Sequence, residues 1–306
     1  MRAAFLGTPA AAIPSLAALI DVADIAVVIT RPDRAKGRSG KPSPPAVKVA
    51  ALEWGLHVEQ PTSRGQLEEV LQHAEADIGV VVAYGRILTR SALETAPAGF
   101  VNVHFSLLPR WRGAAPVERA ILAGDETTGV SLMQIDEGLD TGPVIAAVET
   151  PIASDETGGS LSGRLSYLGA MLIDDVVPDL LAGRLEAAPQ LRIGVTAAGL
   201  LTPAEAQIQL TWEVDHAERA VRAFNPRPGA WFAMEGKRFR VYEASPSDES
   251  VTPGVVAPFN GQAVLGLHGG SLSLDVIQPA GKAPMSGTAW LNGRRGAGGR
   301  IDAPAE

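Results

Sequence analysis

Residues 102–116 read NVHFSLLPRWRGAAP and continue an apolar run that begins at Phe100. Apolar residues surround Asn102 and His104 along this run, which predicts a buried β-strand over residues 100–105. Side chains alternate between the two faces of a strand, so the amide and the imidazole project to the same face. The proline and glycine residues that follow predict a rigid loop. Because ligands of open α/β sheets bind beyond the carboxyl ends of the strands, the stretch predicts a functional site.

Further strand-like runs alternate with helical patterns through the first half of the chain. The runs lie at residues 3–7, 25–30, 78–85, 129–135 and 143–152. The helical patterns lie at residues 15–20, 46–54, 66–73 and 161–181, and we expect Pro178 to bend or end the last of them. Alternation of helices with continuous apolar strands predicts an α/β fold whose parallel sheet is covered on both faces.

The second half of the chain has a different texture. Residues 185–203 show no sustained periodicity, and a helix is predicted at 212–224. Short strands separated by turns follow at 231–234, 239–244, 254–258, 263–267 and 271–277, which predicts a small β-barrel. We therefore expect a first domain at 1–188, a linker at 189–205 and a second domain at 206–306.

Composition narrows the possible classes of protein. A chain of 306 residues suits two domains better than one. The absence of cysteine excludes disulfides, a thiolate nucleophile and cysteine-ligated metal. The net charge of −8 argues against a general nucleic-acid coat protein. The apolar N-terminal stretch is similar to a signal peptide, but Gly7, Pro9 and Pro14 interrupt it, so we favour a strand there. No other run is long enough to predict a membrane span.

A carboxylate completes the candidate site. Asp140 lies between two glycines in the segment 136–142, DEGLDTG, directly after a predicted strand. The glycines permit a tight turn that directs its side chain. An amide, an imidazole and a carboxylate on strand-end loops suit acyl transfer without a covalent intermediate. Ser106 is a poor candidate for a nucleophile because no G-x-S-x-G turn surrounds it. Asp136 and Glu137 have no histidine at ligand spacing, so we expect no metal.

An ordered set of motifs is similar to those of the folate-dependent formyltransferases. VVVAYG precedes NVHFSLLPRWRGAAP and GLDTG follows it, with PSPPAVKV, AGDETTGVSLMQ, RAFNPRPGAW and IQPAGK elsewhere in the chain. The WRGAAP form at 111–116 resembles the methionyl-tRNA formyltransferases of that family in particular. The resemblance implies a Rossmann-like catalytic domain and a C-terminal OB-like barrel that binds tRNA.

The resemblance also implies what individual residues do. Asn102, His104 and Asp140 match the catalytic trio of a transfer of formyl from 10-formyltetrahydrofolate to the α-amine of initiator methionyl-tRNA. The segments lining the folate site are matched by Ser106, Leu107, Leu108 and Pro109 and by Val82, Ala83, Tyr84 and Gly85. The tRNA acceptor loop is matched by the basic segment 31–48, with Arg34, Lys36, Arg38 and Lys41. We expect a cytoplasmic, monomeric enzyme of translation initiation.

Other interpretations stay open. The same fold could formylate a small amine such as a sugar nucleotide, or the chain could be a non-catalytic RNA-binding module. A basic loop is more often solvated surface than a binding site. Ala10, Ala11 and Leu200 depart from the family pattern, the last at a position that is usually lysine, and Phe105 replaces the glycine of many members. We expect a packing or surface role for His57, His73, His216 and His268.

Overall fold

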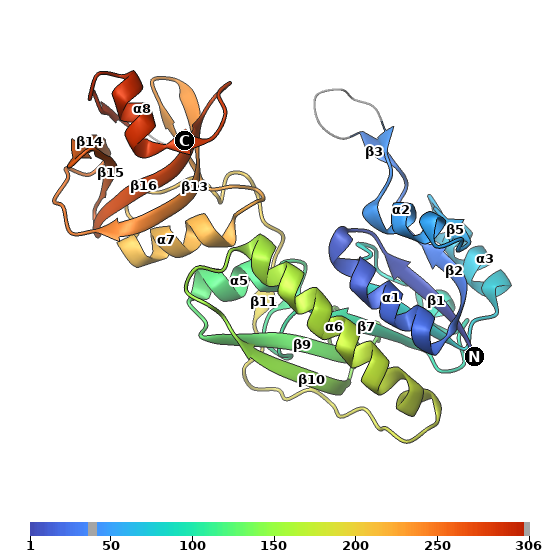
Figure 1. Ribbon diagram of the computed structural model, residues 1–306. Coiled ribbons are helices and arrows are strands. Elements are labelled where there is room, and N and C mark those ends of the chain that lie inside the picture. The colour runs from blue at the N-terminus through green and yellow to red at the C-terminus, as the bar shows by residue number, and fades with distance from the viewer. Residues whose placement is uncertain (36–41, 303–306) are drawn as a thin grey trace. The chain divides into compact units, whose positions relative to one another are not determined.

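The computed structural model describes residues 1–35 and 42–302, which form two compact units (Figure 1). The first unit comprises residues 1–116, 127–151 and 162–199, and the second comprises residues 117–126, 152–161 and those from 200 onward. The domain boundaries expected at 188 and 205 stay a prediction. None of the helices in the described residues combines the length and hydrophobicity that a membrane crossing needs.

A seven-stranded sheet forms the centre of the first unit, in the order β10-β9-β7-β6-β1-β2-β5. Its strands are β1 (Arg2–Gly7), β2 (Asp24–Ile29), β5 (Val58–Glu59), β6 (Ile78–Val82), β7 (Phe100–His104), β9 (Thr127–Gln134) and β10 (Val144–Pro151). This confirms the α/β architecture and the interpretation of the N-terminal stretch as a strand, since β1 pairs with both β2 and β6.

The sheet is not parallel throughout, contrary to what the apolar strand pattern predicts. Strand β9 runs antiparallel to both β7 and β10. A hairpin loop joins β9 to β10, and a connection of that kind can pair only antiparallel strands. From Ala146 to Pro151, partly buried and exposed residues alternate along β10, which is the pattern of a strand with one solvated face.

Helices cover both faces of this sheet. In Figure 1, α1 (Ile13–Val22) and α6 (Gly158–Leu181) lie on the same face. A Cβ atom at Gly169 of α6 would lie 2.6 Å from Val103, so glycine lets this helix approach β7 closely. Pro178 does not end α6, which continues to Leu181. The other helices of this unit are α2 (Ala46–Glu53), α3 (Arg64–Ala74) and α4 (Arg90–Leu93), preceded by the short helix η1 (Ala10–Ala12).

The strand order places the candidate site. Strand β1 has β2 on one side and β6 on the other, so the chain order reverses between β1 and β6. Open α/β sheets bind ligands at such a reversal, beyond the carboxyl ends of the strands. Gly7, Val82 and His104 end the three neighbouring strands β1, β6 and β7 at that edge.

The second unit is a nearly closed antiparallel sheet, which confirms the predicted OB-like barrel. The strand order is β12-β13-β16-β15-β14-β18, and β17 pairs with β16. A bridge between Met234 and Ile301 links β12 to the residue after β18. The strands are β12 (Trp231–Met234), β13 (Lys237–Ser247), β14 (Val255–Phe259), β15 (Gln262–Leu267), β16 (Gly270–Pro279), β17 (Met285–Ser286) and β18 (Gly299–Arg300). Three helices accompany them, α5 (Pro116–Ala123), α7 (Val214–Ala223) and α8 (Gly287–Gly293).

Candidate active site

Asn102 and His104 lie on the same face of β7. Val103, between them, faces α6, so the amide and imidazole project to the other side of the sheet. The imidazole is only 5% exposed, whereas Asn102 is partly buried. The Asn102 side chain makes no hydrogen bond to any residue that the structure describes, so its amide is available to a ligand. The strand therefore delivers two polar groups to one site, as predicted.

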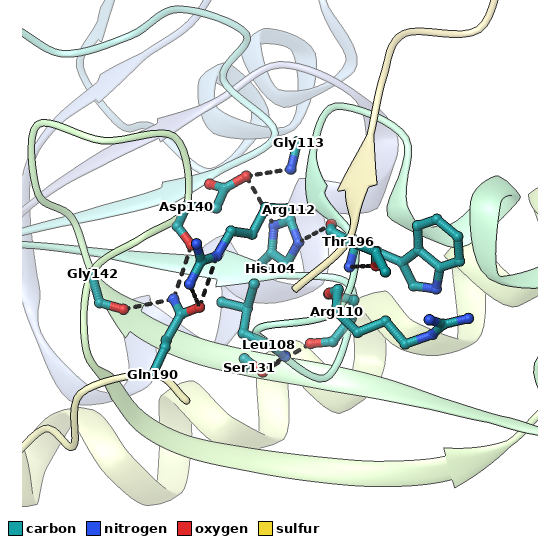
Figure 2. A network of polar contacts seen from close by, with 12 residues as sticks. His104, Leu108, Arg110, Arg112, Gly113, Ser131, Asp140, Gly142, Gln190 and Thr196 are labelled. Carbon is teal, nitrogen blue, oxygen red and sulfur yellow. Dashed lines mark hydrogen bonds and ion pairs between the residues drawn. The ribbon is translucent and has the colours of Figure 1, made fainter. Parts of the chain in front are cut away.

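The hydrogen bonds of His104 fix its tautomer. Nε2 lies 2.9 Å from the carbonyl oxygen of Trp111 (Figure 2). A carbonyl oxygen can only accept, so Nε2 carries a proton and donates it. Nδ1 of the neutral ring is then unprotonated, and it faces Oδ2 of Asp140 at 3.7 Å. His104 is thus ready to take a proton on Nδ1, beside a carboxylate that stabilises the resulting charge.

Asp140 is held in a conformation that few non-glycine residues adopt. Its φ is +52°, and its carboxylate Oδ2 accepts a hydrogen bond of 2.7 Å from the backbone N–H of Gly113. The side chain of Asp136 stabilises the same turn, because its Oδ1 accepts from the N–H of Gly138 and the hydroxyl of Thr141. Asp136 therefore stabilises the turn, and Asp140 is the carboxylate of this turn that faces His104.

Burial decides the pKa of His104. Burial of the ring lowers that pKa, while the neighbouring Asp140 and the carbonyl of Trp111 act in the opposite direction. The net pKa is lowered, because the loss of hydration outweighs the attraction of the carboxylate. The ring is consequently neutral near pH 7 and can act as a base.

Hydrogen bonds made by two buried serines hold the loop after β7 in place. Ser131 of β9 donates its hydroxyl proton to the carbonyl of Ser106 and accepts from the N–H of Leu108, at 2.8 and 3.1 Å. The hydroxyl of Ser106 donates to the carbonyl of Arg110 at 2.5 Å. Ser106 is fully buried and committed to this bond, which agrees with its exclusion as a nucleophile. Leu107, Leu108 and Pro109 are partly buried along this loop.

The segment after β6 exposes backbone at the same edge of the sheet. Val82 and Tyr84 are buried, whereas Ala83 and Gly85 are exposed and have φ values of +48° and +79°. The hydroxyl of Thr8 donates to the carbonyl of Tyr84, and Arg31 donates to that of Gly85. These bonds hold the peptide groups of this segment in place beyond the end of β6.

The structure describes only part of the predicted tRNA loop. Lys36, Arg38 and Lys41 lie outside the described residues. Arg34 is exposed in β3 (Arg34–Ala35), which pairs with β4 (Pro42–Ser43). Lys48 is committed elsewhere in the same unit, since its ammonium contacts Asp33 and Gln60 at 2.9 and 2.6 Å. The basic residues of the segment 31–48 are therefore not equivalent.

Three residues whose role the sequence does not predict join this site. Arg112, Gln190 and Thr196 all bond to backbone or side chains around His104 and Asp140 (Figure 2). Residues 196 and 190 fall in the segment without periodicity. Two residues of that segment form β11 (Ala197–Ala198), which pairs with β8 (Arg112–Gly113). Strands this short leave no hydrophobic pattern, so only the tertiary structure could reveal them.

A cavity with a volume of about 370 Å³ lies beside Gln190 and the turn that follows Asp140. It is lined by Arg112, Thr141, Pro143, Pro189, Gln190, Leu191, Arg192 and Val195. Within the described residues, no group of three or more His, Asp or Glu side chains is arranged to hold a metal ion.

Comparison with known proteins supports the predicted family. Residues 1–177 match the formyl transferase family, and residues 200–295 match the C-terminal domain of formyl transferases. The chain is 46% identical over 301 residues to the methionyl-tRNA formyltransferase of Halorhodospira halophila, covering 96% of each chain. It is 42% identical over 298 residues to that of Myxococcus xanthus, covering 96% of this chain and 95% of the relative.

Solved structures share the fold at lower identity. HypX from Aquifex aeolicus in complex with tetrahydrofolic acid has a TM-score of 0.66 at 16% identity, covering 95% of this chain. This chain spans about half of HypX, 47% of its length. The sugar 3N-formyl transferase WlaRD has a TM-score of 0.65 at 18% identity, covering 92% of this chain and 99% of WlaRD.

Proposed function

The chain belongs to the formyl transferase family and, within it, to the methionyl-tRNA formyltransferases, and on this premise we propose that it formylates initiator methionyl-tRNA. The formyl donor is 10-formyltetrahydrofolate, and the acceptor is the α-amino group of the methionyl ester. The observation that carries the proposal is the match over both units, at 42–46% identity, to relatives of this one activity. Such an enzyme serves the initiation of protein synthesis, and we expect it in the cytoplasm as a monomer.

The donor fits the edge of the sheet between β6 and β7. Exposed peptide groups at Ala83 and Gly85 offer donors and acceptors to the edge of a pterin ring. The leucines of the segment 106–109 offer an apolar wall beside them. Strands β6 and β7, which precede these two segments, pair with each other, and the free amide of Asn102 lies near the end of β7. We assign the segments 82–85 and 106–109 to the folate.

The reaction requires a neutral amine, an activated carbonyl and a path for one proton. An α-amino group has a pKa of about 7.7–8.0, so a substantial neutral fraction exists near pH 7. The amine nitrogen attacks the formyl carbon, and the carbonyl electrons move to its oxygen. The amide of Asn102 donates a hydrogen bond to that oxyanion. Loss of one such donor typically lowers the rate by about 10²–10³-fold.

His104 moves the proton through Nδ1. Because Nε2 is committed to Trp111, only Nδ1 can accept the proton that the attacking amine loses. The imidazolium formed in this way is stabilised by Asp140. When the intermediate collapses, the bond between the formyl carbon and N10 breaks, and Nδ1–H delivers the proton to N10. The products are formylmethionyl-tRNA and tetrahydrofolate, and His104 returns to its initial state.

The tRNA acceptor end is assigned to Arg34, Lys36, Arg38 and Lys41, and the body of the tRNA to the barrel. Arg34 supports this assignment, since it is exposed and has no ion pair among the described residues. Lys48 and Arg31 contact groups of the protein itself, so we leave them out of the assignment.

One assay tests the proposed function. The purified protein is incubated with 10-formyltetrahydrofolate and, in parallel, with methionyl-tRNA, an amino-sugar nucleotide or glycinamide ribonucleotide. We expect formylation of methionyl-tRNA alone. Formylation of a small amine in preference to methionyl-tRNA would overturn the proposal, and folate binding without any transfer would indicate a non-catalytic module.

A further inference from the structure

Gln190 occupies the centre of a hydrogen-bond network beside the catalytic carboxylate. Its side chain makes four hydrogen bonds within the first unit (Figure 2). Nothing in the sequence around it predicts such a role, because it lies after α6 in a segment without sustained periodicity. A side chain with this many partners either has a structural role, in which it holds two loops together, or contributes to catalysis.

The orientation of the Gln190 amide follows from its partners. Arg112 donates from Nε and Nη2 to Oε1 of Gln190, at 3.0 and 2.7 Å. A guanidinium has only donors, so Oε1 must face it and the NH₂ group must face away. That NH₂ group donates to the carbonyls of Asp140 and Gly142, at 2.9 and 2.7 Å. The charge of Arg112 polarises the amide and strengthens both of these donations.

The two carbonyls belong to the residues on either side of Thr141. Holding both of them fixes the peptide group between Asp140 and Thr141 and the one between Gly142 and Pro143, and so the backbone of the turn that follows Asp140. Asp140 has a φ of +52°, which a non-glycine residue keeps only when its surroundings hold it. Its carboxylate must stay in line with Nδ1 of His104 while also accepting from Gly113.

We propose that Gln190 is a positioning residue for formyl transfer, which acts by holding Asp140 in line with His104. The proposal rests on the proposed function, because Asp140 matters to catalysis only if His104 carries the proton. Gln190 contacts Arg112 and the turn after Asp140, and it touches neither the formyl donor nor the acceptor. Its effect is therefore on turnover and passes entirely through Asp140.

The variant Gln190→Glu tests this role. Glutamate has the same size and keeps Arg112 as a partner through an ion pair, but its carboxylate cannot donate to the two carbonyls. We expect kcat to fall by about 10–100-fold, which is typical when a group that orients an active-site residue loses its hydrogen bonds. The KM for the formyl donor should change little. Gln72→Glu is the matched control, since it adds the same charge on the exposed surface of α3. Should Gln190→Glu fail to fold, the uncharged Gln190→Met has a similar length and has no donor, so it removes the same two donations together with the acceptor for Arg112.

A double-mutant cycle with Asp140→Asn distinguishes a role of Gln190 in positioning Asp140 from a purely structural role. If Gln190 acts through Asp140, the double variant has the same single-turnover rate as Asp140→Asn alone. Multiplied losses in the double variant would overturn the proposal, as would a normal kcat in Gln190→Glu. A wild-type protein that does not formylate methionyl-tRNA would instead overturn the proposed function and leave no role of this kind to test.

Discussion

Replacing Asp140 by asparagine removes one charge and almost nothing else. Asparagine tolerates the left-handed conformation seen at Asp140, where φ is +52°. Its Oδ1 can still accept the hydrogen bond from Gly113. The fold and the folate segments should therefore be unchanged, and any effect on the reaction comes from the electrostatics of His104.

The magnitude of that effect follows from the distance of 3.7 Å between Nδ1 and the carboxylate. Two unit charges about 4 Å apart attract by about 4 kcal/mol at an effective dielectric constant of about 20. If the imidazolium is fully formed in the transition state, losing this attraction lowers kcat by about 10³-fold, at about 1.4 kcal/mol for each factor of ten. A partly formed charge gives a proportionally smaller loss.

The assay is single-turnover formylation of methionyl-tRNA, with binding of the formyl donor measured separately by titration. We expect the rate to fall by about two to three orders of magnitude, with the dissociation constant for the donor largely unchanged. Asp175→Asn, which neutralises an exposed carboxylate on α6, is the control. A rate for Asp140→Asn within about threefold of the wild type would refute the role of Asp140 in stabilising an imidazolium.

Three further predictions concern other parts of the chain. Neutralising the four basic residues of the tRNA loop should weaken productive tRNA binding and leave the affinity for the formyl donor unchanged. The slope of the logarithm of the tRNA binding constant against the logarithm of salt concentration should become shallower by about 0.7 for each phosphate that the loop no longer neutralises. An unchanged slope would favour a solvated surface loop. Activity should survive exhaustive chelation, and its restoration by a divalent ion after loss would contradict a metal-free mechanism. In the barrel, Phe232 is buried and stacks on Phe239 with ring centroids 5.3 Å apart. Phe232→Ala should therefore lower the free energy of unfolding of the second unit, measured by denaturant titration, by about 3–5 kcal/mol. A change below about 1 kcal/mol would argue against this packing.

The sequence predicted those parts of the molecule that leave a periodic or chemical pattern. Buried strands such as β6 and β7 are continuous apolar runs, and the position of Asn102 and His104 on one of them follows from strand geometry alone. Asp140 was predictable because glycines bracket it. The short barrel strands were predictable from their turns, although the bridge that nearly closes the sheet was not.

What the sequence could not predict depends on contacts between distant residues. The reversal of β9 depends on how a hairpin packs against the edge of the sheet, which local pattern does not encode. The tautomer of His104 is set by a carbonyl seven residues further along the chain. Gln190 is 50 residues from Asp140, and neither its type nor its neighbours distinguish it from a surface glutamine. The net pKa shift of His104 required knowing how deeply the ring is buried.

The pairing of β8 with β11 has a consequence for how this protein can be divided. The match to the N-terminal family model ends at residue 177, yet Gln190 and both residues of β11 lie after that point. A fragment ending there would retain Asn102, His104 and Asp140 but would lack the backbone that pairs with Gly113. Excision or transplantation of the catalytic half should therefore extend to Gly199, where the first compact unit ends. A two-residue strand, rather than the end of the family match, therefore marks how far the first unit extends along the chain.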